Sequence, residues 1–173
     1  MKCCSFNYRG LVSPLKIPSL NRVILAEHSN VLLLQETLGE GVEVYNRLST
    51  LLPNWKFITL DSLGRSRGIS IGWNSCTIKV INSWGFDSGL DITVTLMELD
   101  KPLTIVNIYG PCHNRGTFWD KVFSKSFLKY KLVIFGGDLN FSLGFSEVWG
   151  THARTNSLTS YFTQKLAEHK FLI

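Results

Sequence analysis

Two patterns of apolar and polar positions alternate along the chain. The runs at 31–34 (VLLL) and 132–135 (LVIF) contain no polar residue, and such runs predict buried strands. Over 90–98 polar and apolar residues alternate, which predicts a half-exposed strand. Further strands are predicted at 3–7, 56–60, 68–73, 77–84 and 103–109.

Elsewhere the apolar residues recur at helical spacing. Pro18 and Ser19 suit the start of a first helix, and a second is expected over 42–51. Thr117 and Asp120 have the spacing of a capping box and are expected to open a third helix. A last helix is marked by the apolar face of Leu158, Tyr161, Phe162 and Leu166. Helices flanking a block of strands predict a layered α/β sandwich.

Composition narrows the class of protein. With 173 residues, 45% of them hydrophobic and 18% charged, the chain is expected to fold rather than to be disordered. Its apolar runs are too short to cross a bilayer, and the first residues lack the apolar segment of a secretory signal. We therefore expect an intracellular protein without a membrane span. The net charge of +5 favours a polyanionic partner only weakly, because the basic residues are dispersed.

Polar side chains follow several of the predicted strands. Asp138 and Asn140 come after the LVIF run and two glycines, and Asn7, Glu36 and Tyr109 end three other strands. If these ends converge, two carboxylates, two amides and a phenol form an oxygen-rich site that suits Mg²⁺ better than zinc. Asn7, Asp138 and Asn140 are also compatible with turn formation. Glu36 is compatible with a solvated strand end, and Tyr109 with a core tyrosine.

Six motifs in chain order resemble the endonuclease/exonuclease/phosphatase superfamily: SFNYRG, LLLQET, GRSRGISIGWN, IVNIYGP, FWD and FGGDLN. Pancreatic deoxyribonuclease and the abasic-site endonucleases share that fold. The chain looks most similar to endonuclease domains of plant non-LTR retrotransposons, over nearly its whole length. The resemblance implies a four-layer α-β-β-α sandwich of two mostly antiparallel sheets.

The resemblance also assigns roles to five residues. Glu36 would be the main ligand of Mg²⁺, or of Mn²⁺, with Asn7 beside it. Asp138 would activate the attacking water, Asn140 would hold the scissile phosphate, and Tyr109 would donate a hydrogen bond to the phosphoryl group. The implied reaction is metal-assisted hydrolysis of DNA phosphodiesters, in the nucleus if the domain is functional. Four loop arginines could contact DNA phosphates or could simply be solvated: Arg9, Arg65, Arg67 and Arg115.

The superfamily pattern continues beyond the last residue of this chain. It runs through further strands and a second Asp to a closing Ser-Asp-His that the sequence does not contain. We therefore expect a single incomplete domain over 1–173 that lacks its last strands. Because losing a positioned acid or base costs roughly 10²- to 10⁴-fold in rate, we expect a weak or inactive enzyme. The alternatives are a catalytically dead fragment that at most binds nucleic acid, and a phosphomonoesterase of the same superfamily.

Overall fold

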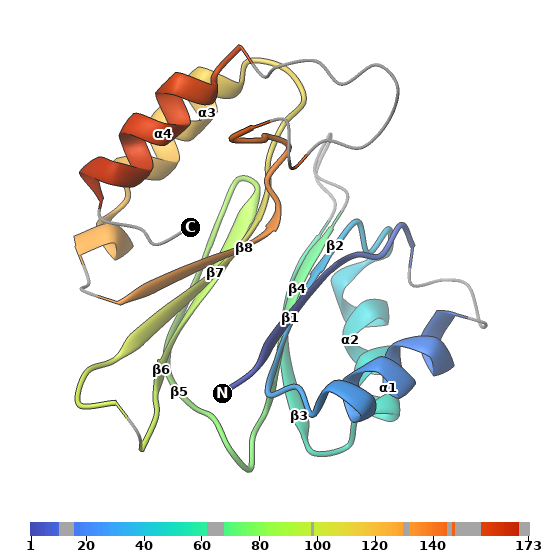
Figure 1. Ribbon diagram of the computed structural model, residues 1–173. Helices are drawn as coiled ribbons and strands as arrows, with labels where there is room; N and C mark the ends of the chain where they lie inside the picture. The colour runs from blue at the N-terminus through green and yellow to red at the C-terminus, as the bar shows by residue number, and fades with distance from the viewer. Residues whose placement is uncertain are drawn as a thin grey trace. The chain divides into compact units, whose positions relative to one another are not determined.

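The structure is a computed structural model that describes residues 1–10, 16–61, 68–97, 99–129, 132–144, 147 and 157–169 (Figure 1). In chain order its elements are β1 (Cys3–Asn7), α1 (Lys16–Glu27), β2 (Val31–Gln35), α2 (Gly41–Leu51), β3 (Trp55–Leu60), β4 (Ile69–Asn74), β5 (Lys79–Phe86), β6 (Gly89–Thr95), β7 (Leu103–Tyr109), α3 (Arg115–Phe123), the 3₁₀ turn η1 (Ser126–Lys129), β8 (Val133–Asp138) and α4 (Thr159–Glu168). No helix among the described residues is both long and apolar enough to cross a membrane.

The chain forms two compact units. The first, here the sandwich unit, comprises Met1–Tyr109 and Tyr130–Asp138 and holds every strand described above. The second, here the helical unit, comprises Gly110–Lys129 and Leu139–Ile173 and holds α3, η1 and α4.

Two four-stranded sheets build the sandwich unit. The first sheet has the order β1-β2-β4-β3, and the second has the order β5-β6-β7-β8. The β1–β2 and β7–β8 pairs are parallel, and the remaining pairs are antiparallel. The predicted α/β class with two mostly antiparallel sheets is therefore confirmed.

Successive side chains along a strand point to opposite faces of its sheet, and they contribute to two separate hydrophobic cores in the sandwich unit. Leu33 of β2 packs with Ile71 of β4 and Ile105 of β7 in a core that joins the inner faces of the two sheets. The next residue, Leu34, points to the other face of the first sheet and packs with helix residues such as Leu48. Figure 1 shows α1 and α2 along this outer face. The β2 strand is thus buried on both faces, as its unbroken apolar run predicts.

Aromatic side chains hold the helical unit together. Trp119 of α3 makes an edge contact with Phe162 of α4, with ring centroids 5.5 Å apart. Phe141 stacks on Phe162 at 3.8 Å, and the Tyr161 hydroxyl donates a 2.7 Å hydrogen bond to Asp120. Burial, followed by the neighbouring Asp120 carboxylate, raises the pKa of Tyr161. These contacts join α3 and α4 side by side.

Two strand predictions were wrong in detail. The LVIF run was expected to be buried and to end at two glycines, but β8 extends through both glycines to Asp138. It is the last strand of its sheet, so its side chains are mostly half-buried and Ile134 is 37% exposed. The strand predicted over 90–98 to be half-exposed is instead buried on both faces, and it ends at Thr95. Its polar face is covered too, since Asp91 and Thr93 are only 5% and 6% exposed.

Two helix starts also differ from the prediction. The first helix begins at Lys16, two residues before Pro18, because proline is tolerated in a first turn whose N–H groups have no partner within the helix. Thr117 and Asp120 lie inside α3 and do not cap it. The capping position is occupied by Asn114 in the left-handed region, with φ 53°.

Candidate functional site

Four of the predicted site residues lie together at one end of the sandwich unit. Asn7 ends β1 and Glu36 follows β2, while Tyr109 ends β7 and Asp138 ends β8. The parallel pairing explains this arrangement, because it aligns Asn7 with Gln35 and Tyr109 with Asp138 at the carboxyl ends of their strands. The two sheets thus present their polar strand ends at the same edge.

Hydrogen bonds connect these four side chains directly. The Asn7 amide donates to Glu36 Oε1 at 3.2 Å and to Asp138 Oδ2 at 2.6 Å. The Tyr109 hydroxyl donates to the same Glu36 oxygen at 3.0 Å. Two donors from two different sheets therefore meet at one carboxylate.

Glu36 combines burial with a rare backbone conformation. It is 6% exposed, and its φ of 53° lies in the left-handed region that glycine favours. Such a conformation costs on the order of 1–3 kcal/mol and persists where the surroundings hold it. Here the Gly10 N–H donates to the Glu36 carbonyl at 2.7 Å, and the Thr37 N–H donates to the Gly68 carbonyl at 3.2 Å.

Gly136 and Gly137, which precede Asp138, are each required to be glycine for a different physical reason. A Cβ on Gly136 would lie 2.4 Å from Leu33 Cδ1, so this position leaves room for the core between the sheets. Gly137 has φ +125°, and a Cβ there would lie 2.0 Å from the Ile108 carbonyl oxygen. The close approach of β8 to β7 that places Asp138 beside Tyr109 therefore depends on glycine.

Asn140 belongs to the helical unit, where its contacts are local. Its side-chain amide donates to the Gly110 carbonyl at 2.6 Å, and its own carbonyl accepts from Arg115 Nη1 at 3.1 Å. Its role in phosphate binding stays a prediction. Arg65 and Arg67 lie outside the described residues.

The donor set of the four-residue site fits a hard divalent cation. Glu36 and Asp138 are both close enough to accept hydrogen bonds from one amide, and two carboxylates brought together favour a cation between them. All the candidate ligand atoms are oxygens, and Mg²⁺ is bound through one or two carboxylates with water and phosphate completing its shell. The described residues contain no group of three or more His, Cys, Asp or Glu that could hold a metal.

Two buried amides beneath the site were not identified from the sequence. Gln35 is 1% exposed and Asn107 is 0% exposed, and their side chains are hydrogen-bonded at 2.6 Å across the two sheets. The signal in the sequence was the asparagine between the apolar residues Val106 and Ile108 of the buried LTIVNIY strand.

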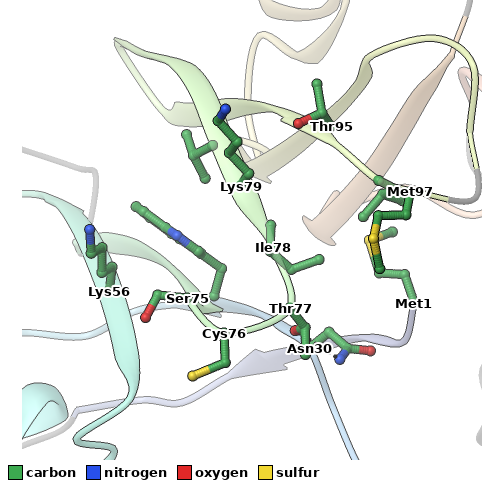
Figure 2. Close-up of a pocket in the computed structure, with 13 residues that line it drawn as sticks. Met1, Asn30, Lys56, Ser75, Cys76, Thr77, Ile78, Lys79, Thr95 and Met97 are labelled. Atoms are coloured by element: carbon green, nitrogen blue, oxygen red, sulfur yellow. Dashed lines mark hydrogen bonds between the residues drawn. The ribbon is translucent and has the colours of Figure 1, made fainter.

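A separate cavity of about 960 Å³ opens at the opposite end of the sandwich unit (Figure 2). Met1 and Asn30, which line it, lie just before the starts of β1 and β2, whereas the site lies where those strands end. Lys56 and Lys79 add two positive charges to its wall. None of the four site residues lines this cavity.

Comparison with known proteins gives matches among solved structures. Neither the protein-family models nor the curated protein sequences give a match. Among solved structures, the endonuclease domain of TRAS1, a telomere-specific non-LTR retrotransposon, superimposes with a TM-score of 0.69 at 14% identity, over 96% of this chain and 71% of that one.

Two further solved structures show the same similarity. An endonuclease/exonuclease/phosphatase family protein from Bacteroides thetaiotaomicron matches with a TM-score of 0.67 at 12% identity, over 94% of this chain and 68% of that one. D. rerio TDP2, in complex with a single-strand DNA product, matches with a TM-score of 0.64 at 16% identity, over 99% of this chain and 65% of that one. The chain thus has the fold of the endonuclease/exonuclease/phosphatase superfamily and spans about two thirds of the length of these neighbours.

Proposed function

We propose that this chain carries the centre of a Mg²⁺-dependent phosphodiesterase that cleaves DNA, as an endonuclease domain of a retrotransposon. The observation that carries the proposal is the hydrogen-bonded convergence of Asn7, Glu36, Tyr109 and Asp138 at one end of the sandwich unit. Oxygen ligands and a hydrogen-bond donor at one point are what hydrolysis of a phosphodiester requires.

The structural neighbours support the choice of substrate. One is a retrotransposon endonuclease domain, and another was solved with a single-strand DNA product. The net charge of +5 agrees with a polyanionic substrate, although charge alone does not distinguish DNA from other polyanions.

Each side chain has a role that follows from its contacts. Glu36, which accepts hydrogen bonds from Asn7 and Tyr109, would be the main ligand of a divalent ion, and Asn7 keeps it beside Asp138. Asp138 is half-buried and accepts a 2.6 Å hydrogen bond, so it can accept a proton from an attacking water while it remains oriented. When bound, the cation would stabilise the charge that develops on the phosphoryl oxygens.

Tyr109 has a role on the substrate side of the site. Its hydroxyl donates to Glu36 in the structure, and the same donor can turn to a phosphoryl oxygen when substrate arrives. Asn140, two residues after Asp138, would contact the scissile phosphate through its side-chain amide.

Nicking of supercoiled plasmid by the purified chain tests this function. We expect slow nicking that requires Mg²⁺ and stops on chelation, and we expect Glu36→Ala to abolish it. Glu43→Ala is the matched control, because Glu43 lies on α2 in an exposed ion pair with Arg47.

Three outcomes would contradict the proposal. Nicking that Glu36→Ala leaves unchanged would reject the site. Hydrolysis of a phosphate monoester with no cleavage of DNA would favour the phosphomonoesterase alternative. A folded protein that binds DNA but does not turn it over would favour the binding fragment, whose affinity should fall steeply with salt.

A further inference from the structure

The site rests on a buried pair of amides, Gln35 and Asn107, which belong to opposite sheets. The Asn107 side-chain N–H groups donate to the Leu34 carbonyl at 3.0 Å and to the Ser70 carbonyl at 2.9 Å. Its oxygen accepts from the Gln35 amide at 2.6 Å, and that amide also donates to Ser5 Oγ at 3.2 Å. One polar group of β7 therefore ties the second sheet to the two central strands of the first.

The Gln35–Asn107 pair lies in the solvent-inaccessible interior, where burying a polar group costs free energy. An amide moved from water into an apolar interior without partners costs about 1–3 kcal/mol, and both side chains here are essentially inaccessible to solvent. The same face of β7 carries Ile105 in the apolar core two residues earlier. An aliphatic residue at position 107 would continue that core, so the amide needs a reason beyond packing.

The reason lies in the positions of its neighbours along each strand. Gln35 directly precedes Glu36, Asn107 precedes Tyr109 by two residues, and Ser5 precedes Asn7 by two residues. Residues two apart on a strand lie on the same face, which relates Asn107 to Tyr109 and Ser5 to Asn7, whereas Gln35 is bonded directly to Glu36. Each member of the hydrogen-bonded group therefore fixes the strand that delivers one site residue.

We infer that the Gln35–Asn107 pair positions Glu36 against Tyr109 and Asn7, and thereby sets the affinity of the site for its divalent cation. The pair touches neither substrate nor ion and acts through the strands that carry the ligands. Gln35 is bonded directly to Glu36, whose φ is 53°, so fixing the Gln35 side chain also fixes the backbone that enters this left-handed conformation. The consequence for cation affinity rests on the proposed function, whereas the positioning itself does not.

Three variants separate positioning from general stability. Gln35→Met removes the side-chain hydrogen bonds of Gln35 at similar volume and leaves Asn107 bonded to both carbonyls. Asn107→Leu removes every side-chain hydrogen bond between the two sheets that Asn107 makes and leaves the one from Gln35 to Ser5. Ile105→Val is the control, because it loosens the core on the same face of β7 and costs roughly 0.5–1.5 kcal/mol without touching a site residue.

The first measurement is made without metal. The Asn7 side-chain NH₂ group donates to both site carboxylates, so its ¹H–¹⁵N signals report their positions. We expect these signals to shift in Gln35→Met and Asn107→Leu and to stay at the wild-type position in Ile105→Val. Signals that remain unchanged in both amide variants would overturn the inference, whether or not the chain proves to be a nuclease.

The second measurement is calorimetric titration of the same proteins with Mg²⁺. Changes in residues that orient metal ligands typically weaken binding about 10- to 100-fold, and we expect that loss in both amide variants and not in Ile105→Val. Equal weakening in all three variants would show that stability alone is responsible. If neither amide variant folds while Ile105→Val does, the pair determines the fold and the positioning role is rejected. A wild-type chain that binds no Mg²⁺ would refute the proposed function and leave the Asn7 signals to decide the inference.

Discussion

Glu36 and Asp91 are carboxylates of the same sandwich unit with nearly the same burial, 6% and 5% exposed, yet their surroundings differ. Glu36 accepts hydrogen bonds from Asn7 and Tyr109 and lies at a strand end in the left-handed region. Asp91 lies within β6, and its carboxylate accepts no hydrogen bond from the side chains and N–H groups of the residues that the structure describes. Burial raises the pKa of Asp91 to about 6.

The difference shows what makes a buried carboxylate a candidate ligand. Burial alone favours the neutral acid, as at Asp91, and a neutral acid is a poor ligand for a hard cation. Donors that converge on a carboxylate, as at Glu36, fix its direction. The size of a cavity does not identify the candidate metal site in this protein, since the 960 Å³ cavity lies at the end of the sandwich unit away from Glu36.

The largest expected effect is on the rate of plasmid nicking, and it compares the same substitution, Asp to Asn, at positions 138 and 91. Asp138→Asn removes the group that would accept a proton from water, so we expect the rate of plasmid nicking to fall by about 10²- to 10⁴-fold. Asp91→Asn should leave the rate at the wild-type level. Equal losses in the two variants would mean that the comparison between the two carboxylates is wrong.

The next effect concerns the backbone that delivers Asp138. Gly137→Ala forces a Cβ to within 2.0 Å of the Ile108 carbonyl at φ +125°, and we expect the free energy of unfolding to fall by about 3 kcal/mol. Gly85→Ala is the control in the same sheet, since its Cβ would meet Leu90 at an ordinary 3.5 Å. Urea denaturation of the two variants measures the contrast, and a small effect at Gly137 would contradict the described approach of β8 to β7.

A smaller effect is expected when the phenol of Tyr109 is removed. Tyr109→Phe keeps the ring and deletes the donor to Glu36 at 3.0 Å, so the carboxylate loses one of its two described restraints. We expect cleavage to slow by about 10- to 100-fold. Stability should change little, because the site is partly open to solvent at Tyr109. Unchanged cleavage kinetics in Tyr109→Phe would remove Tyr109 from the site.

The smallest expected effect is the contribution of Asp91 to the pH dependence of the free energy of unfolding. Its pKa is higher in the folded state than its ordinary value of 3.8, so the folded state binds more protons between about pH 4 and pH 6. The contribution of Asp91 to the free energy of unfolding therefore falls as the pH rises through this window and levels off above it. Asp91→Asn should lack this slope and be the more stable protein at pH 7, which urea denaturation across the pH range will show. A variant whose pH profile parallels that of the wild type would refute the assignment.

Local pattern predicted the strands well and their burial poorly. The strands at 3–7 and 103–109 match β1 and β7 to the residue, because alternation and polar ends mark both boundaries. Exposure depends on where a strand lies in its sheet, which the local pattern does not contain. Hence β8, at an edge, is more exposed than its apolar run predicts, and β6, in the interior, is more buried.

The sequence predicted which residues form the candidate site, but it did not predict how their side chains are arranged. Strand ends with polar residues pointed to Glu36 and Asp138, but their meeting through Asn7 depends on the pairing order of both sheets. The Gln35–Asn107 pair was missed for a related reason. Its partners are 72 residues apart in the chain, and a polar residue within an apolar strand gives no sign of which residue it will meet.

The central claim is that Glu36, with Asn7 beside it, holds a divalent cation next to Asp138. Titration of ¹⁵N-labelled protein with the paramagnetic ion Mn²⁺ tests it most directly, because the ion broadens the amide signals nearest to it first. The account predicts that the signals of Asn7, Glu36 and Asp138 broaden at the lowest Mn²⁺ concentration, while that of Asp91 persists. Broadening that begins at Asp91, or at the cavity wall around Lys56, would contradict it.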